Sequence, residues 1–354
     1  MATPKTALSA LLKTRIEGSG SETIVFCHGY GTDQSIWDKV VPILAQNYRV
    51  VVFDWPFAGS VKDQKLYDPL KYSSFEAFGD DLITLLTEIG IKSATFVGHS
   101  MSGMIGCIAS LKRPDLFKRL VLVCASPRFL NSDDFEGGFK NSDVEQLISA
   151  MENNYEEFAS HFASMIADTA NSENVATVEK YKKGLIKMGA EVALPLAKTV
   201  FYSDYRELLD KVETPCTIIQ TTNDKAVPRS VALYMQNKIK GEATLEIIHT
   251  DGHFPQLTSH LKFIELLLPL ERNFYLFHGL QNFNVDLRRF KSIAQVLETL
   301  GQFFRTWVAP TEKSPSSVCI QPILSLSYSS NDVGVVMMLR TMSLDKQLLS
   351  LSLS

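Results

Sequence analysis

Residues 98–102, Gly-His-Ser-Met-Ser, constrain the fold of this chain more than any other stretch. An apolar run at 94–97 precedes them, and a stretch of small and apolar residues at 103–109 follows. Strand, tight turn and helix in this order are typical of a nucleophile elbow, which raises a serine hydroxyl beside the free N–H groups of a helix N-terminus. The strained turn needs small residues on both sides, and Gly98 and Ser102 meet that need. Because the usual pattern is G-x-S-x-G, a glycine-rich turn without chemistry stays open from this motif alone.

Strands alternate with helices on both sides of this motif. The expected strands are almost continuously apolar, which is typical of parallel strands that are covered on both faces. The alternation predicts an α/β fold with a mostly parallel sheet flanked by helices. We expect strands at 23–27, 49–54, 94–97, 119–124, 217–221 and 244–249, and helices at 75–89, 231–239 and 257–268.

The alternation stops between residues 128 and 201. Helical patterns at 144–151, 155–166 and 178–188 replace it, in a block rich in Phe, Tyr and Met. We expect this block to be a helical lid inserted into an α/β-hydrolase-type core of residues 8–127 and 202–270. Most of its aromatic side chains can equally well form the core of the insertion itself.

Beyond the core, residues 275–354 show no strand–helix alternation. One amphipathic helix is expected at 285–304, followed by a serine-rich segment with two prolines. We interpret 275–354 as a weakly structured appended tail that carries no chemistry.

Composition excludes several classes of function. The 354 residues are 45% apolar and 21% charged with a net charge of -4, so neither nucleic acid nor a membrane is expected as a partner. The five cysteines lack C-x-x-C spacing, which indicates reduced, buried thiols of an intracellular protein. No His/Cys cluster has metal-ligand spacing, so we expect neither a metal nor another cofactor. The N-terminus lacks the apolar region of a secretory signal, and no stretch is long enough to span a bilayer.

Three residues have the order and context of a catalytic triad. A serine becomes nucleophilic when a histidine takes its proton and an acid orients that histidine. In α/β-hydrolases the chain order is Ser, Asp or Glu, then His, each after a strand. Ser100, Asp224 and His253 follow this order. The competitors are weaker, because His249 lies inside an expected strand and Asp251 is too close to His253 to orient its ring.

A tetrahedral intermediate also needs donors for its oxyanion. The backbone N–H of Met101 follows the serine and supplies one donor. The glycine-containing loop at 28–31 follows the first apolar strand, and Tyr30 is its expected donor. The loop can alternatively be a tight turn without chemistry.

With these residues assembled, the chain resembles the plant butenolide-hormone receptors of the α/β-hydrolase fold, the strigolactone and karrikin receptors. The resemblance covers roughly residues 8–270, and the Ser102 variant of the elbow is itself shared by this family. The strings that carry the resemblance are 28–34 with Trp37, 58–61, 98–102, 125–131, 137–139 and 252–253.

The resemblance implies a four-helix lid over an aromatic pocket, a Ser-His-Asp triad and slow hydrolysis of butenolide enol ethers. It also implies signalling in the cytoplasm and nucleus through a leucine-rich-repeat F-box protein and its degradation targets. Tyr30 stands where the hormone receptors usually carry phenylalanine, which indicates a divergent side branch. The pocket residues implied by matching strings are Tyr30, Phe129, Phe139, Phe158, Phe162 and Phe201.

Three functions follow from these observations. The first is a slow serine hydrolase and receptor for a small, apolar, butenolide-like ligand. The second is a ligand-binding signalling protein without useful turnover, and the third is a general carboxylesterase. The complete triad favours the first.

Overall fold

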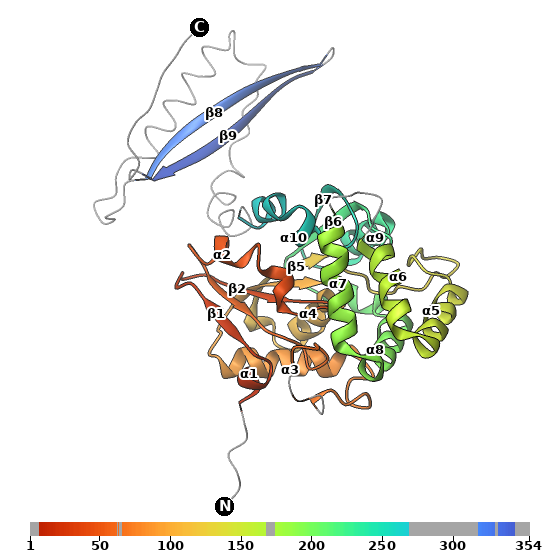
Figure 1. The fold of residues 1–354 in the computed structure, drawn as a ribbon. Helices are drawn as coiled ribbons and strands as arrows, with labels where there is room; N and C mark the ends of the chain where they lie inside the picture. The colour runs from red at the N-terminus through yellow and green to blue at the C-terminus, as the bar shows by residue number, and fades with distance from the viewer. Residues whose placement is uncertain are drawn as a thin grey trace, which may run out of the picture. The chain divides into compact units, whose positions relative to one another are not determined.

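The computed structural model describes residues 7–61, 63, 66–167, 174–268, 318–329 and 332–343 (Figure 1). The chain divides into two units, Met1–Phe277 and His278–Ser354.

A seven-stranded sheet forms the centre of the first unit, in the order β1-β3-β2-β4-β5-β6-β7. Strand β1 is antiparallel to β3, and all other neighbours are parallel, which confirms the predicted α/β fold class. β1 is not among the expected strands, because three residues carry no detectable pattern. The strands are β1 Arg15–Glu17, β2 Thr23–Cys27, β3 Arg49–Val52, β4 Ala94–His99, β5 Phe117–Val123, β6 Cys216–Asn223 and β7 Ala243–Asp251.

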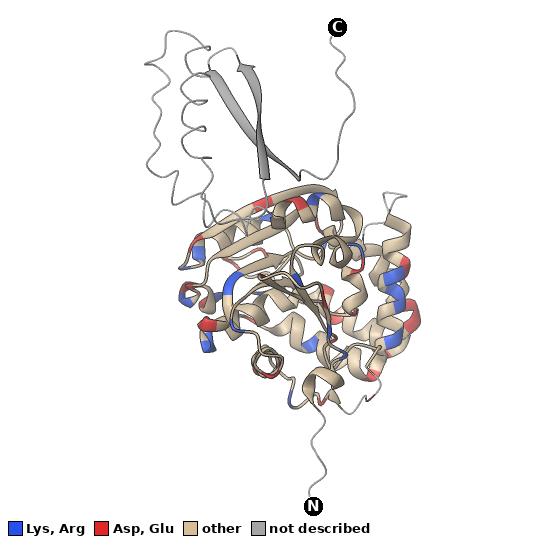
Figure 2. Cartoon of the chain, turned by 90° about the vertical axis from the view of Figure 1, so that its left-hand side faces the viewer, with Lys and Arg blue, Asp and Glu red and all other residues tan. Residues whose placement is uncertain are grey.

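Helices flank this sheet, as the apolar strand pattern predicts. Helix α3 is amphipathic: Phe75, Phe78 and Leu82 are among its buried residues, and it packs against α4. Charged residues lie mainly on outer helices and loops (Figure 2). The flanking helices are α1 Leu8–Leu11, α2 Val41–Leu44, α3 Phe75–Glu88, α4 Met101–Lys112, α9 Arg229–Lys238, α10 Pro255–Thr258 and a further helical segment at 260–268.

Four helices are inserted between β5 and β6, and Figure 1 shows them grouped together. Periodicity finds three of them and not α8, whose interior contains Pro195. Gly189 has a φ of +76° and joins α7 to α8, a backbone conformation that favours glycine. The four helices are α5 Asn141–Asn153, α6 Tyr155–Ala167, α7 Val175–Met188 and α8 Ala190–Tyr202.

In the second unit, β8 Val318–Ser329 and β9 Asp332–Ser343 pair as antiparallel strands. This strand pair is not expected from the sequence pattern. The amphipathic helix expected at 285–304 lies outside the described residues.

The described cysteines, Cys27, Cys107, Cys124 and Cys216, are all buried free thiols. Within the described ranges no helix combines the length and the apolarity that a membrane span requires.

Candidate active site

Ser100 occupies a strained turn between β4 and α4. Its backbone has φ +57° and ψ −126°, which costs on the order of 1–3 kcal/mol for a residue with a side chain. The Ser100 N–H donates to Val123 O at 2.8 Å, so the turn is fastened to the neighbouring strand β5. A Cβ at Gly98 would lie 2.5 Å from Ser102 O, which explains why this position holds glycine. The turn therefore has the geometry of the predicted elbow.

Asp224 and His253 lie after two adjacent strands and meet at the same edge of the sheet. His253 Nδ1 is 2.7 Å from Asp224 Oδ2, and both side chains are buried. The second carboxylate oxygen of Asp224 accepts hydrogen bonds from the N–H groups of Ala226 and Val227, at 2.8 and 3.1 Å. These bonds fix the carboxylate so that it can orient the His253 ring and stabilise a positive charge on it.

The residues that compete for the base and acid positions of the triad lie elsewhere or have other partners. His249 lies on β7 with an exposed side chain. Asp251 accepts a hydrogen bond from Asn223 Nδ2 at 2.6 Å. The structure thus joins His253 to Asp224, the acid that the sequence analysis assigns to it.

The two expected oxyanion donors belong to segments that adjoin Ser100. Met101 is the first residue of α4, where backbone N–H groups lack partners within the helix. The loop that carries Tyr30 packs directly against the serine, because a Cβ at Gly29 would lie 3.0 Å from Ser100 Cβ.

A buried network that the sequence analysis does not include holds this loop. His28 Nε2 accepts a hydrogen bond from Trp55 N at 2.9 Å, so the proton of the neutral ring is on Nδ1, which faces Gly29 O at 3.0 Å. Ser102 Oγ donates to His28 O at 2.5 Å, and Trp55 Nε1 also donates to this carbonyl, at 3.1 Å. The serine that departs from the usual elbow pattern therefore anchors the loop. The only sequence signal for this role is the departure itself.

His99 is a second buried histidine at the site. Its Nε2 lies 2.8 Å from the carbonyl oxygen of His253, so the ring carries its proton there and holds the His253 backbone. Burial, together with the nearby His253, lowers the pKa of His99 well below its usual value. His99 is therefore neutral at pH 7.

Ser100 and His253 line one cavity together with aromatic side chains. Of the predicted pocket residues, Tyr30, Phe129, Phe139, Phe162 and Phe201 line it. Phe158 does not; it stacks on Phe162 with ring centroids 5.1 Å apart. The lining residues that sequence reasoning missed are His99, Ile166, Tyr181, Val200 and Ala226.

The cavity is small. Its volume is about 30 Å³, enough for water but far below the roughly 300–1,000 Å³ of typical ligand pockets. Tyr30 is buried, and its hydroxyl donates to the backbone carbonyl of Ala193 in α8 at 3.1 Å. This hydrogen bond links the loop of the core to the inserted helices. A ligand of ordinary small-molecule size therefore needs more room than this arrangement of side chains leaves.

Among the residues that the structure describes, one cluster has atoms close enough to ligate a metal ion. The ligand atoms of Cys124, Asp224 and His253 all lie within 4.8 Å of one another. Burial raises the pKa of the Cys124 thiol well above its usual value, and a protonated thiol is a poor ligand. Because Asp224 and His253 are already hydrogen bonded to each other, the cluster fits an acid–base pair better than a metal site.

Comparisons with known proteins match this architecture. The family model of the alpha/beta hydrolase fold matches residues 22–259. "Strigolactone esterase D14" of Arabidopsis thaliana is 40% identical over 256 residues, which are 72% of this chain and 94% of that protein. "Karrikin insensitive 2 receptor IA" of Petunia hybrida is 41% identical over 261 residues, 74% of this chain and 94% of that protein.

Among solved structures, a hydrolase from Oleispira antarctica superposes with a TM-score of 0.70 at 29% identity. The match covers 78% of this chain and 97% of that one.

Proposed function

We propose that this chain, which belongs to the alpha/beta hydrolase family and within it to the group of strigolactone esterases and karrikin insensitive 2 receptors, cleaves a small butenolide-like ester with Ser100 as its nucleophile. One observation carries the proposal. Ser100, on its strained turn, lines the same cavity as His253, whose ring is hydrogen bonded to the buried carboxylate of Asp224.

Catalysis uses the hydrogen bonds described above. His253 takes the proton of Ser100 Oγ as the oxygen attacks the carbonyl carbon of the ligand. The backbone N–H groups of Met101 and Tyr30 stabilise the oxyanion. Collapse of this intermediate expels the leaving alcohol or enol, which receives the proton from His253. Water then hydrolyses the acyl-enzyme by the same route, and Asp224 stabilises the imidazolium in both steps.

The cavity volume supports slow turnover of small ligands. About 30 Å³ does not hold a butenolide, so each cycle includes an opening step. We propose that the inserted helices α5–α8 act as the lid that opens. A general carboxylesterase with rapid turnover fits this small cavity less well.

The same opening step supports a receptor role. Ligand binding would change the arrangement of the inserted helices, and such a change can be read by a partner protein. We propose as that partner the F-box leucine-rich-repeat protein implied by the resemblance, acting with its degradation targets in the cytoplasm and nucleus.

The test compares the full-length wild type with Ser100→Ala, using a butenolide enol ether with a chromophoric leaving group. We expect slow product release and an acyl adduct in the intact mass of the wild type. Both should vanish in Ser100→Ala, a loss on the order of 10³-fold or more, because the remaining groups cannot supply a nucleophile. Ser110→Ala is the matched control, since Ser110 lies on α4, the helix that follows Ser100, and donates to Cys107 O, away from the cavity.

The outcomes separate the three functions. A thermal shift with the butenolide but neither product nor adduct would mean that the protein only binds its ligand. Rapid hydrolysis of simple aryl acetates would favour the carboxylesterase. Full activity of Ser100→Ala would contradict the mechanism.

A further inference from the structure

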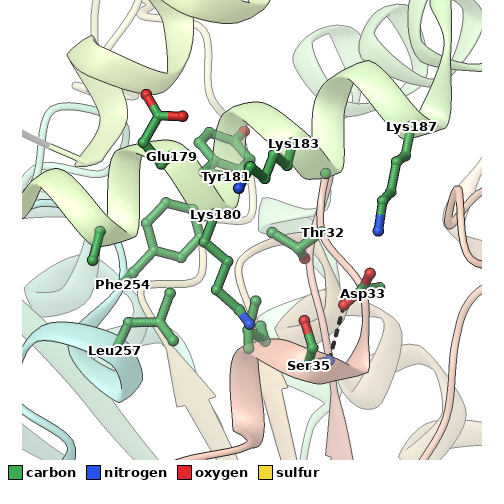
Figure 3. Close-up of a pocket in the computed structure, with 13 residues that line it drawn as sticks. Thr32, Asp33, Ser35, Glu179, Lys180, Tyr181, Lys183, Lys187, Phe254 and Leu257 are labelled. Atoms are coloured by element: carbon green, nitrogen blue, oxygen red, sulfur yellow. Dashed lines mark hydrogen bonds between the residues drawn. The ribbon is translucent and has the colours of Figure 1, made fainter.

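A second cavity lies between α7, the segment 32–36 and α10 (Figure 3). Its volume is about 520 Å³, within the range of pockets that hold small organic molecules. It does not include Ser100 or His253, and none of the predicted site residues lines it.

Three lysines line this cavity from one helix. Lys180, Lys183 and Lys187 follow at spacings of three and four residues, which places them on one face of α7. Figure 3 shows Lys180 and Lys187 reaching from α7 toward the segment 33–35. None of the three forms a hydrogen bond or a close ion pair with a described residue, although Lys180 interacts electrostatically with Asp33. Lys71 and Lys240, in contrast, each pair with a carboxylate.

Acidic groups only partly offset this positive charge. The Asp33 carboxylate lies beside the cavity and accepts a hydrogen bond from Ser35 N at 2.9 Å. Glu179 also lines the cavity, but Figure 3 shows its carboxylate directed away from the segment 33–35. Two ammonium groups, those of Lys180 and Lys187, therefore reach toward the side that holds one fixed carboxylate, and Lys183 adds a third positive charge to the lining, so the cavity favours an anion.

Another part of the lining is apolar. Ile36, Tyr181, Phe254 and Leu257 belong to it and are largely buried in the core, and the rings of Tyr181 and Phe254 are 4.8 Å apart. An occupant that matches both parts of the lining carries an apolar body and one anionic group.

We propose that this cavity binds a small amphipathic carboxylate, with its apolar body against Phe254 and Leu257 and its carboxylate beside the lysines of α7. Tyr181 lines both this cavity and the catalytic one, so the two are separate but adjacent. The proposal does not depend on hydrolysis at Ser100.

Calorimetric titration of the full chain with sodium octanoate at low salt tests the proposal. We expect the wild type to bind octanoate at least tenfold more tightly than octanamide, which has the same body without the charge. The triple substitution Lys180→Gln, Lys183→Gln and Lys187→Gln should weaken octanoate binding at least tenfold, because the favourable charge interaction is removed. Lys182→Gln is the matched control: the residue lies on the same helix but does not line the cavity, and binding should stay within twofold.

A second variant tests the location without changing the charge. Ala176 is exposed at the edge of the cavity, so Ala176→Trp should block it while the protein keeps its melting temperature. Octanoate binding should again fall at least tenfold. Four results would overturn the proposal: no binding to the wild type, unchanged binding to both cavity variants, an equal loss in Lys182→Gln, or equally tight binding of inorganic sulfate, which would show attraction of any anion.

Discussion

The floor and the roof of the catalytic cavity are built in different ways. The floor consists of Ser100 and His253, with Asp224 directly behind His253 and the 28–31 loop beside Ser100. Sheet edges and hydrogen bonds of 2.5–3.1 Å hold these groups. The roof consists mainly of aromatic rings, such as those of the Phe129–Phe201 and Phe139–Phe201 pairs, whose centroids are 6.0 and 5.2 Å apart.

Hydrogen bonds are directional, whereas ring contacts of about 0.5–1.5 kcal/mol per pair tolerate rotation and sliding. Hydrogen bonds therefore fix the reacting groups at the floor. The size of the ligand that the cavity accepts depends instead on the aromatic side chains of the roof, which can rearrange. The predictions below test the floor first and the roof last, from the largest expected effect to the smallest.

The largest effect should come from removing the charge at the floor. In Asp224→Asn the side chain keeps its size but can no longer fix the His253 ring in the required tautomer or stabilise its positive charge. We expect kcat for the butenolide substrate to fall on the order of 10⁴-fold, with little change in ligand binding. Steady-state kinetics and a ligand-induced thermal shift measure the two quantities.

Asp251→Asn is the control for this experiment. It removes a carboxylate from the end of the neighbouring strand, β7, where Asp251 bonds to Asn223 rather than to His253. Its kcat should stay within twofold of the wild type. A large loss in Asp251→Asn with none in Asp224→Asn would reassign the acid.

The second prediction concerns the pH dependence of the free energy of unfolding, to which two buried histidines at the floor contribute. Burial is the main cause that lowers the pKa of both His28 and His99. The unfolded chain takes up these protons near pH 6.5 while the native state stays neutral, so stability is full above this pH and falls below it. Between pH 7.5 and 5.5 the free energy of unfolding should therefore drop, and His99 and His28 contribute losses of the same sign.

Urea unfolding at several pH values measures this dependence. His99→Gln should reduce the drop between pH 7.5 and 5.5, because it removes one of the histidines that the native state keeps neutral. A stability that does not decrease between pH 7.5 and 5.5 would contradict the neutral, buried state of these histidines.

The smallest effect should come from the hydrogen bond that joins floor to roof. Tyr30→Phe removes the donor to Ala193 O and should lower the free energy of unfolding by about 1 kcal/mol. Because opening then costs less, kcat/KM for the butenolide should rise about fivefold if opening limits the rate. Urea unfolding and kinetics on the same preparation measure both.

Tyr155→Phe is the matched control for the roof. Its hydroxyl donates to Leu185 O at 2.7 Å within the inserted helices, and Tyr155 does not line the catalytic cavity. It should lose similar stability without a gain in kcat/KM. Equal kinetics for Tyr30→Phe and the wild type would show that this bond does not restrain opening.

The parts predicted correctly are those with a local pattern. Apolar runs gave the positions of six of the strands, and β4 and α4 flank Ser100 as the elbow pattern predicts. Asp224 follows β6 and His253 follows β7, so strand order alone brings them to one edge.

The pocket residues are harder to predict because helix packing selects among equivalent positions. Phe158 and Phe162 are four residues apart on the same face of α6, yet only Phe162 lines the catalytic cavity. Tyr181 lies on α7 and carries no distinguishing motif. Its place in the cavity follows from the packing of α6 against α7.

The sequence by itself determined the strand–turn–helix at Ser100 and the order of Ser100, Asp224 and His253, because apolar periodicity and turn sterics act over a few neighbouring residues. Only the tertiary structure decided how far the cavity closes and which side chains fix its floor. The Tyr30–Ala193 hydrogen bond spans 163 residues, and the Ser102–His28 bond spans 74. Such contacts depend on how whole elements pack, which no local pattern in the chain encodes.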